Sequence, residues 1–152
     1  MTDDAAPTDT TTPSDEPDVA VVGHDELLGV EYVVVASDEV VLRLPIGPHL
    51  HQPYGIVHGG VWCSVVETAA SIGASTWQSA HGNGGNVVGV SNHTDFLRAV
   101  RDGVVDVRGT PIHRGRSQQL WLVEVTDDQG RLVARGQVRL QNLDTAERLG
   151  RS

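Results

Sequence analysis

The chain has 152 residues, a length that suits one domain with a sizeable hydrophobic core and leaves little room for two. Its formal net charge is −9, but six of the acidic residues fall within residues 1–18, so the remainder is only mildly acidic. All of its basic side chains other than histidine are arginines. This composition argues against non-specific nucleic-acid binding, which relies on a broad basic surface.

The N-terminal segment, residues 1–20, is rich in Thr, Asp, Pro and Ala, and is predicted to be a disordered acidic tail. It has neither the basic start nor the apolar run of a secretory signal, and no part of the chain reaches the roughly 18 apolar residues of a membrane span. Cys63 is alone, so it cannot form an internal disulfide. We therefore expect a soluble cytoplasmic protein with a folded domain at 21–143 and a flexible tail at 144–152.

Turn signals and runs of β-branched residues divide the folded part into helices and strands. A short helix at 24–29 comes first, and Ser37-Asp38 predicts the turn of a hairpin. A glycine-rich run at 80–85 must end the long helix, and residues 127–130 predict the last turn. The predicted strands are 30–36, 40–44, 86–96, 104–113, 118–126 and 132–143, and the long helix runs from about 57 to 78. This order predicts an α+β domain in which a curved sheet packs on one helix.

The long helix has one apolar side and one side that is almost without charge. At about 100° per residue, its apolar positions form a stripe that should pack on the sheet. The opposite side carries a single charged residue, Glu67, where a solvent-facing side would carry many. Small neutral residues there indicate that a second subunit or a ligand comes close, so Glu67 should be partly buried. The stripe comprises Val61, Val65, Ala69, Ile72 and Thr76 with Trp62 at its edge, and the opposite side comprises Gly60, Cys63, Ser64, Glu67, Ser71, Ala74 and Gln78.

The start of this helix carries two glycines, Gly59 and Gly60, directly after His58. Bare backbone N–H groups at a helix start stabilise developing negative charge, and a carboxylate two turns later can attack or act as a base. The combination of Gly59 and Glu67 therefore indicates acyl transfer. His58 could orient the preceding loop or its own helix start, and a purely structural histidine is an equally good interpretation.

A longer motif surrounds these residues. The run Gln52-Pro53-Tyr54-Gly55-Ile56-Val57-His58-Gly59-Gly60, followed by Glu67, resembles the hotdog-fold acyl-CoA thioesterases, in particular the phenylacetate-pathway and 4-hydroxybenzoyl-CoA subgroup. Similarity continues through 89–98 and 130–138 and covers roughly residues 25–143. The resemblance implies a hotdog fold, in which a curved antiparallel sheet wraps around one long central helix. It also implies a homo-oligomer. We expect at least a dimer, and a homotetramer made of two dimers.

The resemblance also implies a role for each residue that matches the motif. The backbone N–H of Gly59 looks like the donor that polarises the thioester carbonyl, and Glu67 looks like the catalytic carboxylate, acting as nucleophile or as base. Gln52 resembles the side chain near the thioester, and His58 the one that holds the loop or substrate. Ser71 matches the hydroxyl that positions water or the carboxylate. In such enzymes the glycine and the acid come from different subunits.

Four further residues are candidates for binding the substrate or its coenzyme A. Gly60 lies beside the expected oxyanion donor. Arg98, Arg116 and Ser117 match positions where relatives contact the CoA nucleotide, and the guanidinium fork suits phosphate groups. Ordinary surface arginines are an equally good interpretation of Arg98 and Arg116.

The sequence thus predicts an acyl-CoA thioesterase that releases a free acid and coenzyme A without a metal or cofactor. An aromatic acyl group, such as a hydroxybenzoyl type, follows from the subgroup that the motif resembles. Two alternatives stay open: a non-catalytic acyl-CoA-binding hotdog protein, and a hotdog enoyl-CoA hydratase or dehydratase. Nucleic acid and membranes are not expected as partners.

Other chemical signals are weaker. His49-x-His51 could place two imidazoles on one side of an extended segment, but no third metal ligand is evident. Cys63 has no base beside it in the sequence, so a small buried thiol is the better interpretation. Asn92-x-Thr94 fits a glycosylation acceptor, which a cytoplasmic chain would not use. Tyr54, Trp62 and Phe96 either line a pocket or pack in the core.

Overall fold

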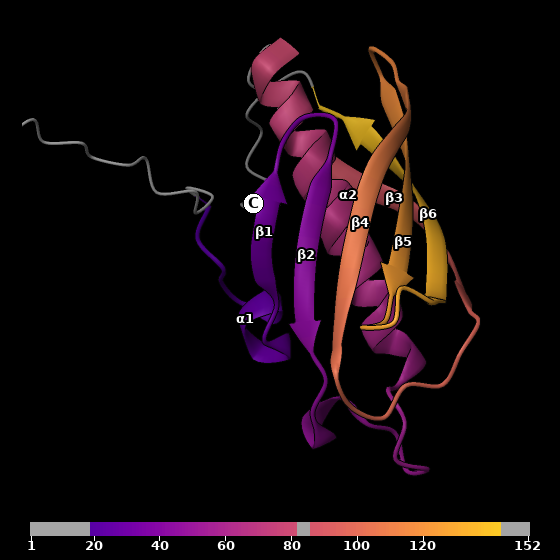
Figure 1. The fold of residues 1–152 in the computed structure, drawn as a ribbon. Coiled ribbons are helices and arrows are strands. Elements are labelled where there is room, and N and C mark those ends of the chain that lie inside the picture. Colours follow the sequence, from indigo (N-terminus) through magenta and orange to yellow (C-terminus); the bar gives the residue numbers. More distant parts are fainter. Residues whose placement is uncertain (1–18, 82–85, 144–152) are drawn as a thin grey trace, which may run out of the picture.

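The computed structural model describes residues 19–81 and 86–143 (Figure 1). The predicted tails at 1–20 and 144–152 lie outside these ranges except for residues 19 and 20. None of the described helices is both long and apolar enough to cross a membrane. The elements are α1 (His24–Leu28), β1 (Glu31–Val35), β2 (Val40–Pro45), a short 3₁₀ helix (Pro48–Leu50), α2 (Gly59–His81), β3 (Val87–Phe96), β4 (Val104–Arg114), β5 (Gln118–Thr126) and β6 (Leu132–Asn142).

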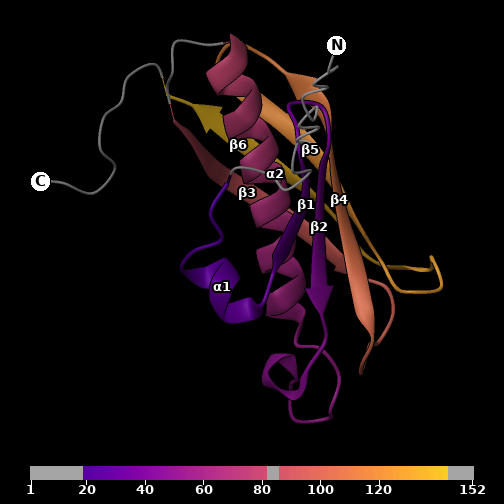
Figure 2. The same ribbon diagram turned by 60° about the vertical axis from the view of Figure 1, so that its left-hand side comes forward.

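The strands form one six-stranded sheet in the order β1-β2-β4-β5-β6-β3, and every neighbouring pair is antiparallel. The long helix α2 lies along one face of this curved sheet (Figures 1 and 2). Among the described strands β3 pairs with β6 alone, so it forms an edge of the sheet. The predicted α+β class, with a curved antiparallel sheet on one long helix, is confirmed.

Most of the predicted boundaries are confirmed to within a few residues. The hairpin of β1 and β2 forms, and β5 has the predicted limits. The helix α2 begins at Gly59 and continues to His81, about one turn beyond the predicted end. In the predicted turn after β5, the Asp127 carboxylate accepts hydrogen bonds from the backbone N–H groups of Gln129 and Arg131. This is the local bonding that makes aspartate a good turn former.

The hydrophobic core lies between α2 and the inner face of the sheet. Buried and exposed residues alternate along the central strands β4 and β5, as the period of two requires when one face is covered. Trp121 on β5 is the largest fully buried side chain, and its ring packs against Gly73 of α2. A side chain at position 73 would occupy the volume of that ring, so the helix approaches the sheet closely there.

The buried side of α2 differs in part from the predicted stripe. Ile72 and Thr76 are only half-buried, whereas Ala74 and Gln78, expected on the opposite side, are buried. Gly73 packs against Trp121 of β5, and Ala74, the next residue, also lies against that strand. The Gln119 side chain donates a hydrogen bond to the Ala74 carbonyl at 3.2 Å. The residues of α2 that are buried are Val61, Trp62, Val65, Val66, Ala69, Ala70, Gly73, Ala74 and Gln78.

The short helix α1 lies beside the N-terminal half of α2 (Figure 2). The Asp25 carboxylate accepts hydrogen bonds from the Tyr32 hydroxyl at 2.7 Å and the Thr68 hydroxyl at 2.8 Å, so it joins α1, β1 and α2. Burial raises the pKa of Tyr32, and the hydrogen bond and negative charge of Asp25 raise it further. A neutral phenol that stays protonated keeps this junction intact at ordinary pH. Thr68, the partner of Asp25 on α2, directly follows Glu67.

Candidate active site

Glu67 lies near the middle of α2, half-buried, and its carboxylate faces β3. Its Oε2 accepts a hydrogen bond from the Asn92 side-chain amide at 3.0 Å. The same amide nitrogen donates to the Cys63 carbonyl, one turn earlier on the helix, also at 3.0 Å. The other oxygen, Oε1, fills the space where a Cβ at Gly89 would lie. The expectation that Glu67 is partly buried is therefore confirmed.

A β-bulge in β3 creates this contact surface. Gly89 pairs with Leu140 and Asn92 pairs with Val138, both buried partners on the inner face of β6. Gly89 and Asn92 are three positions apart, and a regular strand would point residues with odd spacing to opposite faces. The register shift around Val90 adds one residue to β3, so both positions face α2.

The start of α2 is capped by its own histidine. The ring Nδ1 of His58 accepts a hydrogen bond from the Gly60 N–H at 2.9 Å, and the His58 carbonyl accepts one from the Val61 N–H at 2.9 Å. The His58 ring thus binds its own helix start, which is one of the interpretations that the sequence left open. The Gly60 N–H is engaged by this cap, whereas the Gly59 N–H forms no hydrogen bond among residues 19–81 and 86–143. Gly59 is therefore the better placed donor for a ligand.

A pocket of about 360 Å³ opens beside this donor. The Phe96 ring packs over Gly59 at one side of it, and a Cβ at Gly59 would lie 2.6 Å from that ring. The Gln52 side chain reaches the pocket while its oxygen accepts a hydrogen bond from the Tyr54 backbone N–H. Tyr54 itself is exposed and is not part of the lining. The lining residues are Gln52, Ile56, Val57, Gly59, Trp62, Phe96, Leu97, Arg98 and Ala99.

Glu67 does not line this pocket. Eight residues of helix separate it from Gly59, which corresponds to about 12 Å along the axis. Ser71, one turn beyond Glu67, lines a different pocket of about 650 Å³ on the C-terminal half of α2, with Ile72, Ser75 and Asn86. One chain thus carries the donor and the acid at two separate places.

The three residues expected to bind the nucleotide are also divided between two places. Arg98 lines the pocket beside Gly59, next to the end of β3. Arg116 and Ser117 lie between β4 and β5, and their carbonyls accept hydrogen bonds from Asn142 at 3.1 and 2.8 Å. The end of β6 lies beside the start of β3, so the ten residues of β3, about 33 Å, separate these groups.

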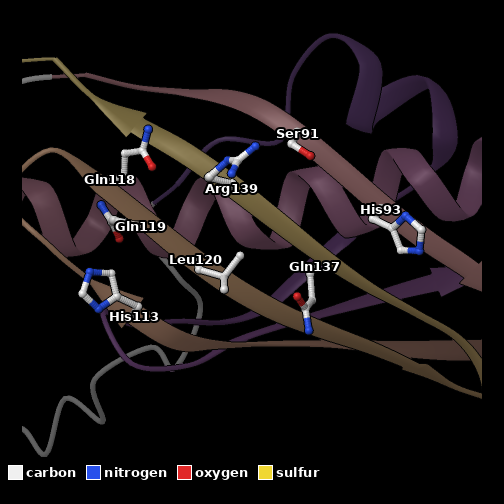
Figure 3. A pocket seen from close by; sticks show the side chains of 8 residues that line it. All are labelled: Ser91, His93, His113, Gln118, Gln119, Leu120, Gln137 and Arg139. Carbon is white, nitrogen blue, oxygen red and sulfur yellow. The ribbon is translucent and has the colours of Figure 1, made fainter.

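A third pocket, of about 480 Å³, lies on the outer face of the sheet, with α2 behind the strands (Figure 3). It holds none of the residues predicted to act on a thioester, and sequence reasoning did not single out its lining. Gln119 is the exception to the outward orientation, since its amide bonds to the Ala74 carbonyl of the helix. The lining residues are Ser91, His93, His113, Gln118, Gln119, Leu120, Gln137 and Arg139.

The histidines considered as metal ligands bond to backbone carbonyls. The His51 ring donates to the Arg101 carbonyl at 2.7 Å, and the His49 ring lies 3.5 Å from the Leu28 carbonyl. Within the part of the chain that the structure describes, no three His, Cys, Asp or Glu side chains are grouped to hold a metal ion.

Asn92 and Gly89 contact the Glu67 carboxylate and Thr94 bonds to Asn92, but the three residues were not predicted to belong to the site. Asn92 and Thr94 lie in the stretch 89–98 that resembles the thioesterases and form a glycosylation pattern, but neither signal gave them a role at the carboxylate. The bulge at Val90 hides their role, because simple alternation along the strand does not place Gly89 and Asn92 on one face. A polar pair, Asn92 and Thr94, on the strand that follows an isolated helical acid is the one signal that could have indicated it.

Known proteins resemble this chain in sequence and in fold. Residues 54–134 match the family model described as the thioesterase superfamily. The Mycobacterium tuberculosis protein named "Putative esterase Rv1847" is 50% identical over 123 residues, covering 81% of this chain and 88% of that protein. The 1,4-dihydroxy-2-naphthoyl-CoA hydrolase of Listeria monocytogenes is 33% identical, in an alignment that covers 74% of this chain and 89% of that protein. The crystal structure of AziG from S. sahachiroi superposes with a TM-score of 0.78 at 44% identity, covering 83% of this chain and all of the other.

Proposed function

Because this chain belongs to the thioesterase superfamily and is a thioester hydrolase, we propose that it hydrolyses acyl-CoA with Glu67 as the acting carboxylate. The observation that carries the proposal is that α2 holds both groups of an acyl-transfer site. Glu67 is a half-buried carboxylate, and the N–H of Gly59 at the helix start has no hydrogen-bond partner among the described residues. An acyl-transfer site needs both, because the carbonyl oxygen gains charge while its carbon is attacked.

Two routes fit this geometry. In one, Glu67 takes a proton from a water molecule as the water oxygen bonds to the thioester carbon. In the other, a Glu67 oxygen itself bonds to that carbon, and water later hydrolyses the resulting anhydride. In both, the Gly59 N–H donates to the oxyanion of the tetrahedral intermediate, whose collapse breaks the C–S bond and releases the coenzyme A thiolate, which takes up a proton. A well-placed donor of this kind contributes about 3–4 kcal/mol to lowering the barrier.

The site is proposed to form between two protomers. A reacting carbon must lie about 3 Å from the attacking group and from the oxyanion donor, which the 12 Å separation of Gly59 and Glu67 within one chain does not allow. A two-fold axis that crosses α2 halfway between them, near Cys63, would bring Gly59 of one protomer to Glu67 of the partner subunit.

The edge strand β3 supports this axis independently. Its outer edge has no partner strand among residues 19–81 and 86–143, and Val90 and Phe96 on it are about half exposed. A long exposed edge invites antiparallel pairing with a second copy. The strand residue bonded to the Cys63 carbonyl is Asn92, which is close to the centre of β3. One axis near Cys63 and Asn92 therefore serves both the helix and the strand.

The same dimer would unite the remaining candidate residues. Antiparallel pairing of β3 places Arg98, at one end of the strand, near the partner subunit's Arg116 and Ser117, which lie at the opposite end. We propose that these groups hold the CoA phosphates. The pocket that begins at Ser71 combines hydroxyl groups with apolar side chains such as Ile72, which suits a hydroxylated aromatic acyl group. A homotetramer of two such dimers in the cytoplasm, with no metal or cofactor, completes the proposal.

The direct test measures thiol release from aromatic, short-chain and long-chain acyl-CoAs. Glu67→Gln keeps the shape of the side chain but removes the ionisable oxygen, so kcat should fall by about 10²–10⁴-fold. Circular dichroism and the thermal unfolding midpoint of the variant should match the wild type. Retention of most of the activity by a folded Glu67→Gln variant would rule out the assignment.

A complementation experiment tests the shared site. Gly59→Pro and Glu67→Gln are each expected to be inactive, but their heterodimer holds one site with both wild-type groups. Random pairing of two differently tagged variants should restore about one quarter of the wild-type activity. Failure to restore activity in a purified heterodimer would place the donor and the acid in the same chain or in separate reactions.

Assays also separate the two alternative functions. A non-catalytic binder would show acyl-CoA binding in calorimetry but no thiol release above that of the Glu67→Gln variant. A hydratase or dehydratase would change the absorbance of an enoyl-CoA without releasing thiol. Thiol release that depends on Glu67 excludes the binder and favours hydrolysis.

A further inference from the structure

One oxygen of the Glu67 carboxylate accepts a hydrogen bond, and the other accepts none among residues 19–81 and 86–143. Oε2 accepts the hydrogen bond from Asn92, whereas Oε1 lies against Gly89, which has no side chain to cover it. Both hydrogens of the Asn92 amide are used, one by Glu67 and one by the Cys63 carbonyl. Since Cys63 lies one turn before Glu67 on α2, Asn92 binds both the helix backbone and the carboxylate.

The orientation of the Asn92 amide follows from chemistry as well as from geometry. Its two neighbours on the helix, the Cys63 carbonyl and the Glu67 carboxylate, are acceptors only, so the NH₂ group must face them. On the other side, the Thr94 hydroxyl donates to the Asn92 Oδ1 at 2.7 Å. A reversed amide would lose both hydrogen bonds to α2 and set its oxygen against a carboxylate.

The Thr94 hydroxyl has room to donate this hydrogen bond because the residue opposite it on the neighbouring strand is a glycine. Thr94 pairs with Gly136 of β6, and its Oγ1 lies 2.6 Å from the position that a Cβ at Gly136 would take. Any side chain at position 136 would displace this hydroxyl. A series of contacts thus leads from Gly136 on β6, through Thr94 and Asn92 on β3, to the Glu67 carboxylate on α2.

We propose that Asn92, fixed by Thr94, is the positioning residue of the Glu67 carboxylate and leaves Oε1 as the oxygen that acts on the thioester. This inference rests on the proposed function, and it holds for either route, since water activation and direct attack each use one carboxylate oxygen. Without the Asn92 hydrogen bond, the carboxylate can rotate about its last torsion. Misplacement of a reacting group by about 1 Å costs about 10²-fold in rate.

The test compares variants of Asn92 and Thr94 in the thiol-release assay. Asn92→Ala removes the donor, and Asn92→Asp keeps the shape but presents an acceptor to the carboxylate. Both should lower kcat by about 10–100-fold while KM stays within about threefold. Thr94→Val keeps the side-chain shape without the hydroxyl and should lower kcat by about 2–12-fold, the value of one hydrogen bond. Thr94→Ser restores the hydroxyl and should recover most of that loss.

The matched control is Gln137→Ala, which removes an exposed amide from the outer face of the neighbouring strand and should leave kcat unchanged. Thermal unfolding of each variant separates a loss of rate from a loss of fold. An Asn92→Ala kcat within twofold of the wild type, or a loss that appears only in KM, would overturn the positioning role. If Asn92→Ala is active while Glu67→Gln is inactive, the inference alone fails. If Glu67→Gln is itself active, the proposed function fails first.

Discussion

The carboxylate of Glu67 fills the space beside Gly89 in which every other amino acid would carry its Cβ. The two residues come from different elements, α2 and β3, and the bulge at Val90 brings them face to face. The backbone at Gly89 does not require glycine, because its φ is not positive. Glycine is needed at this position for the space it leaves to the carboxylate.

Gly89→Ala should therefore inactivate the protein without unfolding it. The added methyl group would occupy the position of Oε1 and displace the carboxylate by at least 1 Å, so kcat should fall by about 10²-fold. Ser91→Ala, whose side chain points to the outer face of the same strand, is the control and should keep its activity. The measurement is thiol release, with the unfolding midpoint recorded for each variant. Wild-type kcat for Gly89→Ala would show that the carboxylate does not act from this position.

Two substitutions at Gly59 separate loss of the N–H donor from crowding by an added side chain. Proline is tolerated at the first position of a helix but has no N–H, so Gly59→Pro deletes the oxyanion donor. Gly59→Ala keeps the donor and adds a Cβ against the Phe96 ring, as proline also does. We expect kcat of Gly59→Pro to be about 10²–10³-fold below that of Gly59→Ala, the effect of one oxyanion donor. Equal rates for the two variants would remove Gly59 from the mechanism.

Gly73→Ala should destabilise the fold even though alanine is the better helix former. The intrinsic gain is about 1 kcal/mol, but the new methyl group would meet the Trp121 ring in the core. Overpacking of a core typically costs about 1–3 kcal/mol, so we expect a net loss of stability in urea unfolding. Ser75→Ala, on the exposed side of the same helix, should change the unfolding free energy by less than about 0.5 kcal/mol. A more stable Gly73→Ala would show that β5 can retreat from the helix.

Asp127 gives the stability of the β5–β6 turn a pH dependence. Desolvation raises the pKa of this carboxyl, but hydrogen bonds from the Arg131 and Gln129 N–H groups and from the Arg131 guanidinium outweigh it, and the pKa is lowered. Its contribution is therefore complete above the unfolded pKa of about 3.9 and is lost as the pH falls through the lower folded value. Asp127→Asn should lower the unfolding midpoint at pH 7, and the difference from wild type should shrink below about pH 4. Asp128→Asn is the control, and a difference that does not depend on pH would contradict this account.

Local chemistry made much of this architecture predictable. Glycine, aspartate and proline mark the turns, and the runs of valine and leucine between them form strands within a few residues of their predicted limits. The helix start at His58-Gly59-Gly60 and the isolated acid Glu67 were equally visible. The resemblance to a hotdog thioesterase, drawn from those residues, agrees with the family to which the chain belongs.

Other features depend on distances that spacing along the chain does not encode. Gly73 and Ala74 lie against Trp121 and Gln119 of β5, residues more than 40 positions away in the sequence. The partners of Glu67 depend on a bulge that shifts Asn92 onto the inner face of β3. Sequence periodicity assumes a regular strand and therefore assigns Asn92 to the wrong side.

The sequence by itself determined the elements, the fold class and the two residue types that acyl transfer requires, because these depend on local backbone preferences and on the periodicity of apolar residues. Only the tertiary structure decided which groups meet. It sets Asn92 and Gly89 against the two carboxylate oxygens of Glu67, and it packs the Phe96 ring over Gly59. The physical reason is that hydrogen bonds and close packing act over a few ångströms in space, between residues far apart along the chain.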